Sequence, residues 1–250
     1  MVPQYDDDDL SKQEPSVGNK RLRKLPPRKP PWNAWQALFL LALVNLIEWP
    51  LGWLQPSVNL DTGQGIGHFL LVGFGEAVLY LAILLLAFAL WRYALPLLGL
   101  VPAAGRSLIA GIGYGTFLFF AIGLLGNYLT KLFGTPPPQS FALAVQGASH
   151  NWELVLLLVL GGLVAPLKEE LIFRGMLYPP LRQAYGRGLG IILTSLVFAL
   201  LHLDFVRFIP LFLGGVMLAW LYERTGSLWP SIIAHGTWNT LMAVALWLQR

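Results

Sequence analysis

The sequence contains no cysteine and little charge: only 12% of its 250 residues are Asp, Glu, Lys or Arg. The absence of cysteine excludes disulfides, thiol catalysis and cysteine metal sites. The charged fraction is about half that of an ordinary soluble domain, whereas 56% of the residues are hydrophobic. A soluble chain of this size could not cover its surface with so few charges. The composition therefore predicts an integral membrane protein, with the lipid bilayer as a partner.

Seven apolar runs approach or reach the roughly 20 residues that a helix needs to cross a bilayer. They lie at about 34–54, 67–92, 107–128, 153–178, 189–203, 208–222 and 229–248. We therefore predict an all-α fold, a polytopic transmembrane helix bundle of about seven spans, or eight with a re-entrant segment. The fifth and sixth runs are short, which is tolerable if neighbouring helices shield their ends. Glycines at 186, 188 and 190 predict a turn between the fourth and fifth runs.

Basic residues are unevenly distributed among the connections between these runs. If the chain starts inside the cell, the cytoplasmic connections hold Arg92, Arg106, Arg182, Arg187 and Arg224, and the outer ones hold only Lys131, Arg207 and Arg250. This asymmetry follows the positive-inside rule. We therefore predict a multi-pass protein of the cell membrane with its N-terminus in the cytoplasm.

The first 31 residues differ from the rest of the chain. An acidic run, Asp6 to Asp9, is followed by basic residues and prolines without apolar periodicity. This pattern predicts a disordered cytoplasmic tail over 1–31. The basic residues directly precede the first apolar run, where an anchor on anionic lipid explains them better than nucleic-acid binding does.

Charged groups inside apolar runs are costly to bury, so each is a functional hypothesis. The fourth run contains Lys168-Glu169-Glu170-Leu171-Ile172-Phe173-Arg174-Gly175. Glu170 and Arg174 are four positions apart, which puts them on one helix face where they can form an ion pair. Glu169 lies about 100° round the helix. The ion pair therefore leaves this second carboxylate unexplained.

Two histidine motifs lie in other runs. The fifth run contains Phe198-Ala199-Leu200-Leu201-His202, and the last contains His235-Gly236-Thr237-Trp238-Asn239. A lone histidine on an apolar helix is more often a hydrogen-bonded core residue than a catalytic one. Counted at about 1.5 Å per residue from the cytoplasmic ends, Glu169, His202, His235 and Asn239 share a layer near mid-membrane. A common depth is what a shared site requires.

These groups can together hydrolyse a peptide bond. A carboxylate held between helices, away from bulk water, is a stronger base than one in solution and can take a proton from water. Histidine can orient that water or bind a metal, and Asn239 with a protonated histidine can donate hydrogen bonds to the developing oxyanion. No serine stands in an evident nucleophile arrangement, which favours activation of water.

The three motifs, Glu-Glu-x-x-x-Arg, Phe-x-x-x-His and His-x-x-x-Asn, resemble those of the CAAX-protease and bacteriocin-processing family, which includes prenyl-protein endopeptidases. Their order and helical placement match too, over about residues 154–248. The resemblance implies a catalytic helical core over 153–250, with Glu169 as general base supported by Glu170 and Arg174. It implies that His202 contacts water or metal, and that His235 and Asn239 face the oxyanion or support groups that do. The N-terminal transmembrane helices, 32–152, lie outside it and are assigned packing or substrate gating.

The resemblance leaves metal dependence open. Family members are usually described as metalloproteases, yet metal-independent activation of water by glutamate has also been argued. Glu169, His202 and His235 can bind a divalent ion such as zinc as a three-ligand site, and the same residues can hold water without one. The sequence has no His-Glu-x-x-His helix to decide the matter.

We therefore predict an intramembrane endopeptidase that acts on a membrane-associated polypeptide. Two other classes stay open at this point. A non-proteolytic immunity or scaffold membrane protein is one, because some family members are described in that way. A proton-coupled transporter is the other, suggested by intramembrane carboxylates and histidines and disfavoured by the lack of a visible inverted repeat.

Four titratable residues lie outside the motifs. Glu48 falls near the predicted outer surface and is interpreted as solvated. Glu76 is deeper in its apolar run, where it either pairs with a buried cation or lines the site cavity. His68 and His150 fall in predicted outer connections and are interpreted as solvated.

Overall fold

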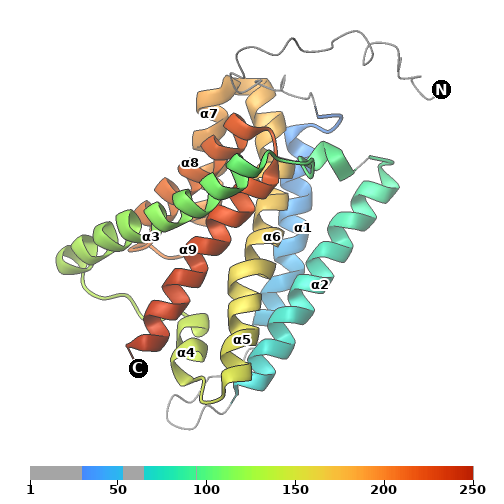
Figure 1. Ribbon diagram of the computed structural model, residues 1–250. Helices are drawn as coiled ribbons and strands as arrows, with labels where there is room; N and C mark the ends of the chain where they lie inside the picture. The colour runs from blue at the N-terminus through green and yellow to red at the C-terminus, as the bar shows by residue number, and fades with distance from the viewer. Residues whose placement is uncertain (1–29, 53–64, 94, 250) are drawn as a thin grey trace.

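The computed structural model describes residues 30–52, 65–93 and 95–249, and within these ranges every regular element is a helix (Figure 1). The all-α prediction is therefore confirmed. The predicted tail, apart from residues 30 and 31, lies outside the described residues, and so does the side chain of Glu48.

The helices correspond closely to the predicted apolar runs. In chain order they are α1 (Ala34–Gly52), α2 (Ile66–Leu90), the short 3₁₀ helix η2 (Leu95–Leu98), α3 (Gly105–Phe133), α4 (Ser140–Gly147), α5 (Asn151–Val159), η3 (Leu160–Val164), α6 (Ala165–Glu170), η4 (Leu171–Leu177), α7 (Tyr178–Leu200), α8 (Phe208–Thr225) and α9 (Leu228–Leu248). Each predicted run falls on one helix, except that the fourth run covers α5 to η4 as one continuous helical path. The short α4 is an element that the apolar runs did not predict.

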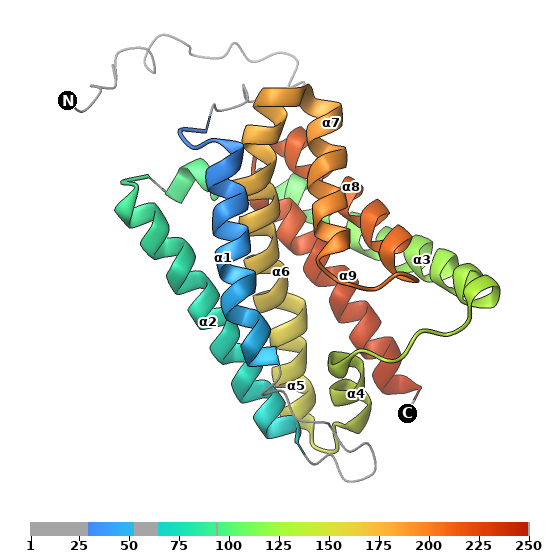
Figure 2. The same cartoon turned by 180° about the vertical axis from the view of Figure 1, so that it is seen from behind.

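Long helices surround a shorter hairpin. The path from α5 to η4 extends along the whole height of the molecule and α2 and α9 along most of it, whereas the loop between α7 and α8 lies only partway down (Figure 2). This half-depth hairpin explains why the fifth and sixth apolar runs are short. On the other side of α9, α3 crosses it and splays outward (Figures 1 and 2).

The helical chain from α5 through α7 is irregular at three places. The segments η3 and η4 are π-helical, with Ala165 N–H bonded to Leu160 O and Tyr178 N–H bonded to Phe173 O, each five residues back. A proline, Pro166 or Pro179, directly follows each of these donors. Because a proline ring clashes with the carbonyl four residues earlier, a widened turn before it relieves the contact. The third irregularity is Gly186, whose φ of 80° breaks α7 and confirms the predicted turn at that glycine.

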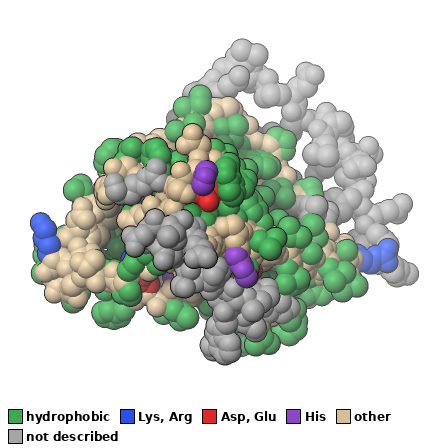
Figure 3. Space-filling model, turned by 90° about the horizontal axis from the view of Figure 1, so that it is seen from below, with side chains coloured by type: hydrophobic (Ala, Val, Ile, Leu, Met, Phe, Trp, Pro, Cys, Tyr) green, Lys and Arg blue, Asp and Glu red, His purple; other side chains and the backbone are tan. Residues whose placement is uncertain are grey.

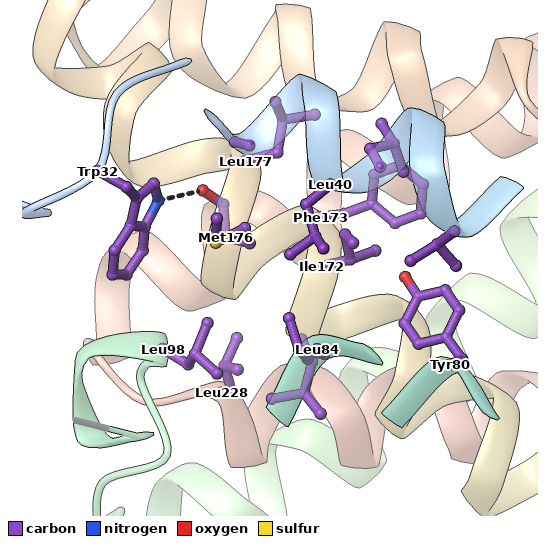
Figure 4. Close-up of a cluster of buried hydrophobic side chains, with 14 of the residues drawn as sticks. Trp32, Leu40, Tyr80, Leu84, Leu98, Ile172, Phe173, Met176, Leu177 and Leu228 are labelled. Carbon is purple, nitrogen blue, oxygen red and sulfur yellow. Dashed lines mark hydrogen bonds between the residues drawn. The ribbon is translucent and has the colours of Figure 1, made fainter. Parts of the chain in front are cut away.

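Hydrophobic packing joins the N-terminal helices to this path. Figure 4 shows Ile172, Phe173, Met176 and Leu177 of η4 in one buried cluster with Leu40 of α1 and Leu84 of α2. All of these side chains are less than 6% exposed. The first two helices therefore support the segment that carries Glu170 and Arg174, which agrees with the packing role predicted for 32–152; the division into those domains stays a prediction.

Large apolar side chains are exposed along the outer faces of α2 and α3. Leu71, Leu90, Ile109 and Leu124 are each more than 70% exposed, whereas a soluble monomer rarely shows so wide an apolar surface. By length and composition α2 and α3 can each cross a membrane, and the apolar segment of α1, Ala34–Leu46, is shorter. The number of spans and the orientation of the N-terminus stay predictions.

Hydrogen bonds tie the connections together at the end that is predicted to be cytoplasmic. Leu228 N–H donates to Gly99 O at 2.9 Å, and Ser227 Oγ donates to Val101 O at 2.7 Å. Seen from the opposite end, the molecule shows few charged side chains, and those of Lys and Arg lie at its margins (Figure 3).

An ion pair adds to the links at the first end. Arg182 Nε donates to Glu223 Oε2 at 2.8 Å, and Tyr178 Oη donates to the same oxygen at 2.8 Å. The hydrogen bond to Glu223 raises the pKa of the Arg182 guanidinium above its ordinary value. Burial would raise the pKa of Glu223, but the hydrogen bonds from Arg182 and Tyr178 outweigh burial and hold that pKa below its ordinary value.

Candidate active site

A fully buried ion pair forms the inner part of the site. Arg174 Nη1 donates to Glu170 Oε1 at 2.8 Å, and both side chains have 0% exposure. Arg174 Nη2 donates to the carbonyl of Gly215 in α8 at 3.1 Å. The pair predicted from the four-residue spacing is therefore confirmed, and the guanidinium also fastens the α6–η4 segment to α8.

His235 of α9 lies between the two adjacent carboxylates of α6. Its Nδ1 is 2.8 Å from Glu170 Oε1, and its Nε2 is 3.8 Å from Glu169 Oε2. Glu170 Oε1 is an acceptor, so Nδ1 carries the proton and donates it. The ring therefore presents Nε2 toward Glu169, whose side chain is 23% exposed while that of His235 is 4% exposed.

His202 approaches this network through Phe198. The residue lies in the turn after Leu200, just past the end of α7 rather than inside a helix as predicted. Its Nδ1 is 2.8 Å from the carbonyl oxygen of Phe198, which makes Nδ1 the donor. Nε2 of the neutral ring is then the acceptor. The helix ends here because Leu203, with φ of 50°, takes the left-handed conformation.

The Phe198 ring contacts several of these groups, although the sequence motifs predict no role for it beyond its place before His202. Its centroid is 4.7 Å from the His202 ring and 6.1 Å from the His235 ring. The Arg174 guanidinium carbon lies 4.7 Å from the same centroid. Phe198 is 1% exposed and therefore forms a buried contact with both Arg174 and His202. Only its recurrence in the Phe-x-x-x-His pattern could have marked it.

Asn239 contacts backbone rather than another site side chain. Its Nδ2 donates to the carbonyl oxygen of Gly161 in η3 at 3.0 Å. His235 and Asn239 thus both face the α5–α6 path, as their four-residue spacing predicts. The predicted donation from Asn239 to an oxyanion stays a prediction, since one N–H of the amide is already used by Gly161.

A cation lies on the other side of α6. The Lys168 ammonium sits 5.0 Å from the centroid of the Tyr80 ring of α2, a distance at which a cation and a ring attract. Tyr80 is 4% exposed, and Glu76, one turn earlier on α2, is half-buried. Lys168 was visible in the sequence beside the carboxylates, but its aromatic partner on α2 was not.

The free Nε2 atoms of His202 and His235 could bind a metal, but the positions of the two rings do not form a metal site. Both rings have Nδ1 engaged and Nε2 available, the arrangement common in metal-binding histidines. Within the residues that the structure describes, however, no group of three or more His, Cys, Asp or Glu side chains is close enough to hold an ion. Glu169, His202 and His235 in this arrangement therefore do not fit a three-ligand site, and we derive no step through a metal.

The remaining histidines lie away from the site. His68 is exposed in the first turn of α2, so it belongs to a helix rather than to a connection. His150 precedes α5, and its side chain is 67% exposed. Its backbone N–H donates to Glu153 Oε2 at 3.0 Å, closing a capping box at the start of α5. Both side chains are exposed, and their contact with water stays a prediction.

Comparison with known proteins adds the family. Residues 151–241 match the family described as type II CAAX prenyl endopeptidase Rce1-like. The matched segment contains all three motifs and the whole network around His235. We call residues 151–241 the Rce1-like core because of this similarity. The similarity supports protease activity and a membrane environment.

Three curated relatives are similar to longer or shorter parts of the chain. An Escherichia coli protein named "Uncharacterized 24.3 kDa protein" is 26% identical over 208 residues, which cover 80% of this chain and 92% of that protein. The Bacillus subtilis (strain 168) protein named "Putative membrane peptidase YdiL" is 24% identical over 146 residues, 58% of this chain and 59% of that protein. The Lactococcus lactis protein named "UPF0177 protein YxdF" is 27% identical over 79 residues, 31% of this chain and 43% of that protein. No solved structure matches the chain significantly.

Proposed function

We propose that the Rce1-like core is an intramembrane endopeptidase in which Glu169 takes a proton from a water molecule held between Glu169 and His235. The observation that carries the proposal is the position of the His235 ring between the two carboxylates, with Nδ1 on Glu170 and Nε2 3.8 Å from Glu169 Oε2. A buried carboxylate that only balanced Arg174 would not need a second carboxylate beside it.

The separation of Glu169 and His235 suits a bridging water. At 3.8 Å the two atoms are too far apart for a direct hydrogen bond. A water oxygen about 2.8 Å from each of them would donate one hydrogen to Glu169 Oε2 and the other to His235 Nε2. Both hydrogens would then be held on the protein side, so that a lone pair of the water would point toward a substrate carbonyl.

The reaction follows from that geometry. The water oxygen attacks the carbonyl carbon while its proton passes to Glu169. When the carbon–nitrogen bond breaks, the protonated Glu169 returns that proton to the departing amine. Glu170 keeps His235 in the Nδ1–H tautomer, and Arg174 stabilises the negative charge of Glu170. The chain's own groups therefore account for both proton transfers of the hydrolysis.

The substrate that fits is an extended segment of a membrane-associated polypeptide. A helical backbone protects its carbonyls by internal hydrogen bonds, so the scissile segment must be unwound when it reaches Glu169. The family description names CAAX prenyl endopeptidases, and we propose the same bond class here, a peptide bond near a membrane surface, without requiring a prenyl group on the substrate.

The test compares polypeptide termini in membranes that contain equal amounts of wild type, Glu169→Gln or Glu76→Gln. We expect new termini with the wild type and with Glu76→Gln, which replaces another half-buried carboxylate of the helices, and none with Glu169→Gln. Identical termini in all samples would contradict the proposal and favour a non-proteolytic immunity or scaffold role. Loss of the termini in both variants would show that Glu76 is required as well, so that the effect of Glu169→Gln would not be specific to Glu169.

A further inference from the structure

Prolines remove hydrogen-bond donors on both sides of the segment that carries the candidate catalytic groups. In a helix each carbonyl accepts from the N–H four residues later, or five residues later in a π turn. Pro166 precedes Glu169 by three positions, and Pro179 and Pro180 follow Arg174 by five and six. Since proline has no N–H, carbonyls on either side of this segment need donors from elsewhere.

The first carbonyl is that of Gly161. Ala165, which would bond to it in an α-helix, donates instead to Leu160 O in the π turn. The next nitrogen along the chain belongs to Pro166 and has no hydrogen. Asn239 Nδ2 supplies the missing donor at 3.0 Å from Gly161 O. The contact joins residues 78 positions apart, so it fastens α9 to the helical path from α5 to η4.

The two helices meet at this point through glycine. A Cβ atom placed on Gly236 would overlap the carbonyl oxygen of Gly162, and one placed on Gly162 would overlap Thr240 Oγ1. Gly236 directly follows His235, and Asn239 lies one turn further along α9. The close approach and the amide hydrogen bond therefore fix the height of the His235 ring against Glu169 and Glu170.

The second carbonyl is that of Met176. The nitrogen that an α-helix would place opposite it belongs to Pro180. Trp32 Nε1 donates to Met176 O at 2.8 Å, as the dashed line in Figure 4 shows. Trp32 is 2% exposed, and its ring packs against those of Phe88 and Tyr93 at centroid distances of 5.3 and 5.6 Å. Trp32, which lies outside the residues matched by the Rce1-like family, thus hydrogen-bonds to η4.

We propose that Asn239 and Trp32 are positioning residues that replace the helix donors lost at Pro166 and Pro180, and so hold Glu169, Glu170 and Arg174 at the height of His235. The proposal rests on the proposed function, because position matters only if these groups react. It gives Asn239 a role that does not require contact with substrate, and it gives Trp32 a role in catalysis although Trp32 lies outside the three motifs.

The decisive experiment gives residue 166 back its backbone N–H in a variant that lacks the Asn239 amide. Asn239→Ala leaves Gly161 O without a partner, and we expect kcat to fall by about 10- to 100-fold with little change in KM, as small displacements of reacting groups do. Pro166→Ala returns an N–H five residues after Gly161. The double variant Asn239→Ala/Pro166→Ala should therefore be several-fold more active than Asn239→Ala, with the pH profile of the wild type.

A matched pair of variants tests Trp32. Trp32→Phe keeps an aromatic ring in the buried cluster but removes its N–H, so we expect a lower kcat. Pro180→Ala returns the α-helical donor to Met176 O, and Trp32→Phe/Pro180→Ala should recover activity. The crossed double variant Asn239→Ala/Pro180→Ala is the control. It should not recover activity, because the returned N–H lies at the wrong carbonyl.

The outcomes separate the positioning roles from the proposed function. If each matched double variant is no more active than its single variant, the donor exchange is wrong, and Asn239 acts on substrate or oxyanion directly. If the wild-type protein cleaves nothing, the proposed function fails, and the same variants are compared by their unfolding midpoints in detergent. Matched doubles that regain stability while crossed doubles do not would then uphold the donor exchange, and equal midpoints would overturn it.

Discussion

Replacing Arg174 with Met should destabilise the protein far more than breaking any ion pair near its ends. Arg174 and Glu170 are both fully buried, and Glu170 Oε1 takes hydrogen bonds from Arg174 and His235. Glu170 Oε2 has no hydrogen-bond partner in the described part of the chain. Without the guanidinium, a buried carboxylate would keep His235 as its single donor. Breaking such a pair from one side costs about 3–5 kcal/mol.

Arg182→Met is the matched comparison. The Arg182–Glu223 pair has the same 2.8 Å separation, but its side chains are 25% and 13% exposed. Water can solvate the carboxylate that remains, so we expect a loss of about 1 kcal/mol. The free energies of unfolding are measured for both variants in detergent micelles by titration with a denaturing detergent, with helicity as the signal.

A double variant separates charge from packing. Glu170→Gln/Arg174→Met removes the unpaired charge, so it should be more stable than Arg174→Met alone. If Arg174→Met costs no more than Arg182→Met, the buried network is not what holds α6 and η4 in place, and the account of the inner site is wrong.

Two further predictions concern Glu223 and the glycine contact. Since the folded protein holds the pKa of Glu223 below its ordinary value, the stability gained from its bond to Arg182 is present above about pH 4.3 and is lost as the pH falls through the lower folded pKa. The difference in unfolding free energy between wild type and Glu223→Gln should therefore shrink on acidification, and a difference that grows would contradict the sign. Gly236→Ala should lower both stability and proteolysis because its Cβ would overlap Gly162 O, whereas Gly113→Ala, with nothing within 4 Å of the added Cβ, should resemble the wild type in both measurements. Equal losses in the two alanine variants would show that the close approach of α9 is unimportant.

The helices could be predicted because apolar runs in this sequence are long and end at polar residues. The run at 67–92 became α2, Ile66–Leu90, and that at 229–248 became α9, Leu228–Leu248. The helix Ser140–Gly147 was missed because eight residues are too few to form a recognisable run. The π turns leave no periodic signal of their own, and only Pro166 and Pro179 mark where they end.

The site was predictable where it depends on spacing within one helix. Glu170 and Arg174 pair as their four-residue separation requires. Sequence spacing also put Glu169 on a different face from Glu170, and that is why the position of the His235 ring between the two carboxylates could not be foreseen. The bond from Asn239 to Gly161 O was equally hidden, since the acceptor is a backbone atom 78 residues away that is available only because residue 166 is proline.

His202 shows the limit of predicting position from helix ends. Its depth was counted along a run assumed to be helical to residue 203, but α7 ends at Leu200 and His202 lies in the following turn. The His202 ring makes an edge contact with Phe198, whose ring also makes an edge contact with that of His235. A three-dimensional contact of this kind is set by packing of α7 against η4 and α8, which one sequence does not encode in any local pattern.

The most direct test of the central claim is hydrolysis by purified protein in water enriched with oxygen-18. Wild type and Glu169→Gln, reconstituted at equal folded concentrations in lipid vesicles, are given a membrane-anchored peptide identified from the termini found in membranes. The account predicts that the wild type releases a fragment whose new carboxylate carries the heavy oxygen, and that Glu169→Gln releases at least about 100-fold less. Equal incorporation by both proteins would contradict the assignment of Glu169 as the base that activates water.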